Sequence, residues 1–289
     1  VERPIENRYE LNERLANLFE SAMETLDKKL SYARYQAIAY LKPEAANGLY
    51  DNAELISRSL AGIRKNGLVK RLESSFYAFQ ISLNNFRQAN QNMIDMFNRD
   101  KVFIAPDLDI NNLLEAGLSD EEIEEKLNAK AEENPKNSVF KAEEFDPEYI
   151  ELLQQDQEIL EKLYKDWEGI TDEDDSKFAK FNELLKHELF KVERNLEQKL
   201  VVFSESVDTV KYLERRINRK DVLVISADNR SKLFKTIREN FDANYKTKLN
   251  KYNIILTTDV LAEGVNLHRA NVIVNYDTPW NSTRLMQRI

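Results

Sequence analysis

The chain has 289 residues but no cysteine, only two histidines and six glycines, and no long apolar run. Without cysteine, disulfides and thiolate metal sites are excluded, and His187 and His268 are too isolated to suggest a histidine-rich site. We therefore predict no metal site within the chain. No run of about 18 apolar residues and no signal-peptide pattern is present, so we expect no membrane contact and a cytoplasmic location.

The charge is distributed unevenly along the chain. From Lys199 onward there are 16 Lys and Arg against 10 Asp and Glu, whereas the net charge of the whole chain is −9. A basic tail joined to an acidic body indicates that only the tail faces a polyanion. Ordinary variation of surface charge would explain the same numbers, and the charge alone does not separate the two interpretations.

Residues 1–175 read as a mostly helical region. Apolar residues recur in steps of three and four from Val69 to Phe97, which predicts one long amphipathic helix with Asn90 as the single polar member of its stripe. Packing against another helix of the same chain is the simpler explanation, and a coiled coil with a partner is the alternative. Residues 100–147 contain three prolines and predict an irregular connection.

The pattern of apolar and polar residues changes at Lys199. Short apolar runs at 200–203, 222–225, 254–256 and 272–274 alternate with amphipathic segments at 207–217 and 231–241. This alternation predicts an α/β fold, in which a parallel sheet is flanked by helices on both faces. We expect two domains, a helical region over 1–175 and an α/β domain over 176–289.

Polar clusters follow three of these runs. They are Ser204-Glu205-Ser206, Thr257-Thr258-Asp259 and Asn275-Tyr276-Asp277. In open parallel sheets ligands bind beyond the carboxyl ends of the strands, where hydroxyl groups and helix N–H groups suit phosphate oxygens. The same residue types are also the usual helix caps, so each cluster alone has a purely structural explanation.

Gly264 is the only glycine after Gly169, and it lies seven residues beyond Thr257. A glycine there would let the backbone approach a ligand closely or adopt a positive φ. A helix C-cap is the structural alternative, and the spacing alone does not decide between them.

The surrounding residues carry a resemblance. The stretch "TTDVLAEGVNLHRANVIVNYDTPWNSTRLMQRI" closely resembles motif V and the start of motif VI of superfamily 2 helicases, especially the SNF2-like bacterial branch. "KLVVFSES" resembles motif IV, the first strand of the second RecA-like domain, and "SKFAKFNELLKHEL" resembles the helix that leads into it. "KRLESSFYAFQISL" resembles a helical stretch that some members carry between their two RecA-like domains.

The resemblance implies roles for single residues. The nucleic-acid backbone would be contacted by Ser204, Ser206, Thr257 and Thr258. The nucleotide side of the cleft would be lined by Glu263, Gly264, Asn266, Gln287 and Arg288. By the same resemblance, Asp259 is a structural partner of Arg288, whereas Asp277 and Trp280 are architectural.

Such helicases and translocases hydrolyse ATP with Mg²⁺ between two RecA-like domains while they move along DNA or RNA. The Gly-Lys-Ser/Thr loop of the first domain is absent, because none of the six glycines precedes a lysine. The chain also stops before the later arginines of motif VI. We therefore expect a fragment that needs the missing first RecA-like domain, has no ATPase activity alone and holds no cofactor tightly.

Two other interpretations stay open. The first is a helical scaffold or protein-interaction module with a degenerate α/β domain that no longer binds ATP, which the acidic helical body favours. The second is a dinucleotide or methyl-donor site of the Rossmann type, but no G-x-G-x-x-G pattern supports it.

Overall fold

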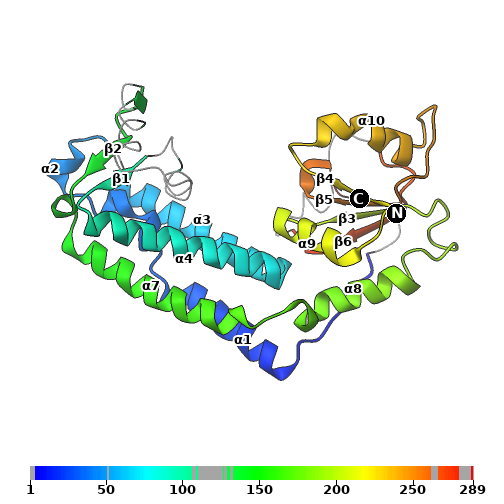
Figure 1. Cartoon of the computed structure of the whole chain (residues 1–289), viewed down its shortest axis with the longest axis horizontal. Helices are drawn as coiled ribbons and strands as arrows, with labels where there is room; N and C mark the ends of the chain where they lie inside the picture. Colours follow the sequence, from blue (N-terminus) through cyan, green and yellow to red (C-terminus); the bar gives the residue numbers. More distant parts are fainter. Residues whose placement is uncertain are drawn as a thin grey trace. The chain divides into compact units, whose positions relative to one another are not determined.

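The computed structural model describes residues 4–50, 52–105, 109, 126, 129–130, 133–261, 266–279 and 288. It divides into two compact units (Figure 1). The sheet unit contains Val1–Asn17, Lys70–Ile81 and Ile170–Ile289, and the helical unit contains Leu18–Val69 and Ser82–Gly169. The two units differ in their bounds from the predicted division into residues 1–175 and 176–289, because residues 1–17, 70–81 and 170–175 belong to the sheet unit.

The sheet unit is built on four parallel strands in the order β4-β5-β3-β6. They are β3 (Leu200–Phe203), β4 (Val222–Ile225), β5 (Ile254–Thr257) and β6 (Val272–Asn275). The helices of this unit are α8 (Ser176–His187), α9 (Val207–Ile217) and α10 (Arg230–Phe241), followed by a short 3₁₀ turn at Asp259–Leu261. The predicted α/β fold is confirmed, and every strand lies where an apolar run predicted it.

Helices cover both faces of the sheet because side chains alternate along each strand. Leu200, Val202, Ile254 and Leu256 pack on one face with residues of α8 and α9, such as Phe181 and Leu213. Val201, Phe203 and Ile255 pack on the other face with Ile237 and Phe241 of α10. Continuous apolar strands are the sequence signature of a sheet that is buried on both sides.

The helical unit contains most of α1 (Glu13–Glu24), α3 (Ala53–Ser74) and α4 (Phe76–Asn98), together with α2 (Pro43–Ala46) and α7 (Pro147–Glu168). Within residues 100–147, which were predicted as irregular, β1 (Val102–Ile104) pairs antiparallel with β2 (Ser138–Phe140). Among the residues listed above, no helix is long and apolar enough to cross a membrane.

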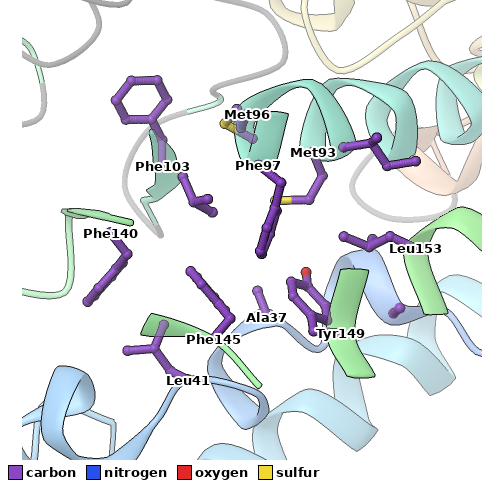
Figure 2. Packing of buried hydrophobic residues seen from close by; sticks show 13 residues of the cluster. Ala37, Leu41, Met93, Met96, Phe97, Phe103, Phe140, Phe145, Tyr149 and Leu153 are labelled. Carbon is purple, nitrogen blue, oxygen red and sulfur yellow. The ribbon is translucent and has the colours of Figure 1, made fainter. Parts of the chain in front are cut away.

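Aromatic side chains form the centre of the core of the helical unit. The rings of Phe97, Phe145 and Tyr149 stack or tilt against one another with centroids 5.0 to 5.6 Å apart. Figure 2 shows them between Met93 on α4 and Leu41, which lies on a neighbouring segment. This cluster explains why the stripe predicted after Val69 ends in Phe97.

The predicted long helix from Val69 to Phe97 is wrong in one respect. Ser75 separates α3 from α4, although the apolar spacing runs through it without a change. The carbonyl oxygens of Glu73 and Ser74 accept hydrogen bonds from Lys177 Nζ, both at 2.8 Å. A side chain that takes up helix carbonyls is a known cause of a helix break. Tertiary contact therefore overrides the local periodicity.

Candidate functional site

The carboxyl ends of the four strands meet at one edge of the sheet. Phe203 pairs with both Thr257 and Asn275, and Ile225 pairs with Thr257. The residues that follow the strands, Ser204, Ser226, Thr258 and Tyr276, are therefore neighbours along this carboxyl edge. The three polar clusters singled out from the sequence do come together here.

Three of the four predicted nucleic-acid contacts are buried inside the unit. Ser204, Ser206 and Thr257 are each 0% exposed. Ser204 Oγ donates to Asp277 Oδ2 at 2.6 Å, Ser206 Oγ accepts from the backbone N–H of Thr209 at 3.2 Å, and Thr257 Oγ1 donates to Ile225 O at 3.2 Å. These hydroxyl groups have partners within the unit, and their contact with a phosphate stays a prediction. For Ser206 the structural alternative holds, because it caps α9.

Thr258 is placed differently. Its side chain is partly exposed, and within the described ranges its hydroxyl makes no hydrogen bond. It lies directly beyond β5, next to the loop that leaves β4. Of the four predicted contacts, only Thr258 offers a side chain to a ligand at this edge.

Asp277 organises the middle of the edge. Its Oδ2 accepts hydrogen bonds from Ser74 Oγ at 2.5 Å and from Ser204 Oγ, and its Oδ1 accepts from the backbone N–H of Glu205 at 2.7 Å. The carboxylate thereby joins the loop after β6 to the loop after β3. The predicted architectural role of Asp277 is confirmed, whereas Trp280 lies outside the described residues.

Arg288 pairs with Asp259, as the motif resemblance predicted. Arg288 Nε donates to Asp259 Oδ1 at 2.6 Å, and Nη1 donates to Asn275 Oδ1 at 3.1 Å. The Arg288 side chain is 0% exposed, and its guanidinium lies over the ring of Phe203 at 5.3 Å. A buried guanidinium with these partners orders the end of β6 and the turn after β5.

The nucleotide side is described only in part. Glu263, Gly264 and Gln287 lie outside the described residues, so the role of Gly264 stays a prediction. Asn266 is half-buried, and its Oδ1 accepts from the backbone N–H of His268 at 3.1 Å. Within the described ranges Arg288 Nη2 has no hydrogen-bond partner. These two side chains do not form an ATP site by themselves, and we derive no hydrolytic step from them.

The first turn of α10 is a site that the sequence reasoning missed. Its N-cap residue, Asn229, makes no capping hydrogen bond, because Asn229 Oδ1 accepts instead from the N–H of Ser226. The turn contains no acidic residue, and Ser231 and Lys232 are exposed. Helix N-terminal N–H groups beside a lysine favour an anion. The signal was present in the sequence as a serine and two basic residues just after an apolar run.

The first turn of α9 has the opposite character. Ser206 occupies one of its free N–H groups, Asp208 adds a negative charge, and Glu205 precedes them. Lys70 Nζ lies 3.5 Å from Glu205 Oε2, and Arg71 Nη1 donates to Glu205 O at 3.4 Å. The accessible part of the carboxyl edge that suits a phosphate is therefore the part at the ends of β4 and β5. Among the described residues, no group of three histidine or acidic side chains could hold a metal ion.

Residues 176–289 match the family model "Helicase conserved C-terminal domain". The chain is 28% identical over 95 residues to "Probable ATP-dependent RNA helicase ddx51" of Dictyostelium discoideum, which covers 32% of this chain and 17% of that protein. It is 28% identical over 101 residues to "Uncharacterized ATP-dependent helicase YqhH" of Bacillus subtilis (strain 168), covering 33% of this chain and 16% of the relative. The chain thus spans about a sixth of the length of these relatives.

Among solved structures, a crystal structure of the Pyrococcus furiosus Hef helicase domain aligns with 94% of this chain and 49% of its own. The sequence identity is 15% and the TM-score is 0.35. The family match and the relatives agree with the prediction of a helicase C-terminal domain at residues 176–289, and membership of superfamily 2 stays a prediction. The SNF2-like bacterial branch stays a prediction.

Proposed function

We propose that this chain, whose residues 176–289 match the model of a helicase C-terminal domain, supplies the second RecA-like lobe of an ATP-dependent DNA helicase or translocase of the SNF2-like bacterial branch. The observation that carries the proposal is the set of polar groups at the carboxyl ends of β4 and β5. There the partly exposed Thr258 lies beside a basic, uncapped helix N-terminus.

The physical basis is recognition of the phosphate backbone. A hydroxyl group, a helix N-terminus without a side-chain cap and a lysine at one edge can bind successive phosphates without reading their bases. The contact would depend on salt, since a lysine that neutralises a phosphate releases a condensed counterion. The acidic part of the edge around α9, where Glu205 and Asp208 lie, would not contact the nucleic acid.

The test is a titration of the 289-residue chain with labelled single-stranded DNA, duplex DNA and RNA, read by fluorescence anisotropy over a range of salt concentrations. Lys232→Ala should weaken binding and lower the slope of log K against log salt by about 1. Thr258→Val should weaken binding about fivefold, as expected for loss of one hydrogen bond.

The matched control is Lys220→Ala. Lys220 is exposed on the same unit, but it precedes β4 and therefore lies at the opposite, amino edge of the sheet. It should bind like the wild type. Equal loss of binding in the Lys220 and Lys232 variants would refute a site at the carboxyl edge.

ATP hydrolysis is the second part of the proposal. We expect the cleft to close on ATP and Mg²⁺ between this lobe and a first RecA-like domain that carries the Gly-Lys-Ser/Thr loop. Because the chain contains no such loop, it should not hydrolyse ATP alone. Mg²⁺-dependent phosphate release by the purified chain would contradict this assignment.

The protein-interaction module remains the second candidate, and one observation favours it. Leu55, Ile56, Leu60 and Ile63 on α3 are 39 to 67% exposed. Exposed aliphatic side chains that gather on one helix often mark an interaction surface. Failure of all three nucleic acids to bind, even at low salt, would favour this candidate over the motor.

A further inference from the structure

The break between α3 and α4 is a built feature of the sheet unit. Lys177 Nζ holds the carbonyl oxygens of Glu73 and Ser74, and Ser75 Oγ accepts from the N–H of Ala78 at 3.1 Å to begin the next helix. Burial lowers the pKa of Lys177, and the neighbouring Asp277, Asp175 and Glu73 oppose that shift. The break therefore has its own cap at each side.

The break is bonded to the carboxyl edge of the sheet. Ser74 Oγ lies 2.5 Å from Asp277 Oδ2, 2.7 Å from Thr209 Oγ1 and 3.3 Å from Ser204 Oγ. Ser75 Oγ lies 2.9 Å from Thr209 Oγ1. Ser74 and Ser75 are 1% and 4% exposed, so these hydrogen bonds form without competition from water.

A second link lies one turn earlier on α3. Lys70 and Arg71 both contact Glu205, as described above, which holds the loop after β3 from its outer side. The segment from Lys70 to Ser75 thus contacts the loop after β3 at two places, Ser204 and Glu205. Lys70 and Arg71 both serve this internal contact.

We propose that the break is a coupling element and that Ser74 is its positioning residue. Through Ser74 and Asp277, a rearrangement of the loops at 204–206 and 276–277 is passed to α3 and α4, which continue from the break into the helical unit. This inference rests on the proposed function, since a polynucleotide bound at the ends of β4 and β5, next to the loop that follows β3, is what would rearrange the loops. Buried hydrogen-bonded networks suit this task because they change between discrete arrangements.

The test is hydrogen–deuterium exchange on the 289-residue chain, with and without single-stranded DNA. In the wild type, DNA should slow exchange across residues 70–81. Ser74→Ala should abolish that effect while DNA still binds, because Thr258 and the first turn of α10 are untouched. Without DNA, the same variant should speed exchange at residues 204–209 by about tenfold, the loss expected for one hydrogen bond to a charged acceptor.

Two matched variants sharpen the result. Ser59→Ala removes an exposed hydroxyl from the same helix and should change neither region. Ser75→Ala removes the contact between Ser75 and Thr209 but leaves Ser74 bonded to Asp277, so this variant should retain the response to DNA. If Ser74→Ala does not fold, the wild-type response decides the matter, because DNA binding without slower exchange at residues 70–81 overturns the coupling.

The outcomes separate the two proposals. DNA binding with no change at residues 70–81 would overturn the coupling and leave the proposed function standing. Absence of DNA binding would overturn the proposed function. In that case the DNA-free comparison decides: faster exchange at 204–209 in Ser74→Ala supports the link, and unchanged exchange overturns it.

Discussion

Replacing Asp277 by alanine should destabilise the sheet unit severely. The carboxylate is 9% exposed and accepts three hydrogen bonds, two from buried serine hydroxyls and one from the N–H of Glu205. Hydrogen bonds to a charged acceptor contribute about 1.5 to 3 kcal/mol each. Ser74 and Ser204 lie 3.3 Å apart and can partly satisfy each other. We therefore expect a loss of about 3 kcal/mol rather than the full sum.

Asparagine at the same position should cost much less. Its oxygen can accept from the N–H of Glu205, and its amide can donate to the serine hydroxyls, which rotate to accept. The loss should be about 1 kcal/mol, because the shape and the number of bonds are kept. Asp208→Asn is the control for charge, since Asp208 lies in the first turn of α9 and is only partly buried. It should cost only a few tenths of a kcal/mol.

The measurement is the exchange of the β3 amides, which open only when the sheet unit opens, as a function of urea concentration. A loss of about 3 kcal/mol should lower the midpoint by about 1 to 2 M urea. If Asp277→Ala lowered it no more than Asp208→Asn, the carboxylate would not hold the edge together. Equal losses for Asp277→Ala and Asp277→Asn would show that charge, not hydrogen bonding, is what matters there.

Three further predictions concern single side chains. Burial and Arg269 lower the pKa of Lys199 from 10.5 to about 8, so the folded state binds fewer protons in this window. As the pH rises from about 8 to 10.5, the free energy of unfolding of the wild type should therefore increase by on the order of 2 kcal/mol relative to that of Lys199→Met. The measurement is a urea titration of both proteins at a series of pH values. Asn90→Ala should destabilise the helical unit by about 2 kcal/mol in exchange of the α4 amides, because Asn90 Nδ2 donates to Leu153 O and Gln157 Oε1. Ser206→Ala should cost about 1 kcal/mol, measured as faster exchange in the first turn of α9.

The sheet was predictable from the sequence because its signal is local. Four short apolar runs rich in β-branched residues became the four strands, and the amphipathic segments between them became α9 and α10. Because the sheet is buried on both faces, each strand reads as a continuous apolar run. The secondary structure of a segment with such a local pattern can be predicted without information about its contacts with other segments.

The break at Ser75 and the roles of the strand-end serines were not predictable, because they depend on residues far away in the sequence. Lys177 is about a hundred positions from the carbonyls that it holds, and Asp277 is 203 positions from Ser74. A serine after a strand fits a helix cap, a loop lock or a phosphate contact equally well. The pairing of Asp259 with Arg288 was found in advance only because the motif resemblance supplied the long-range information.

The burial of Ser204, Ser206 and Thr257 changes how the edge would hold a strand of nucleic acid. With these hydroxyls engaged inside the unit, direct contact falls to Thr258 and the first turn of α10. The loop after β3 then has another task, since Asp277 and the α3 break fix it from inside and Lys70 and Arg71 from outside. A loop held in this way is suited to respond to a nucleic acid bound beside it, because even a small displacement of the loop must break several buried hydrogen bonds together. The residues that would bind the nucleic acid and the loop that would respond to it thus follow adjacent strands, β5 and β3, at one edge of the sheet.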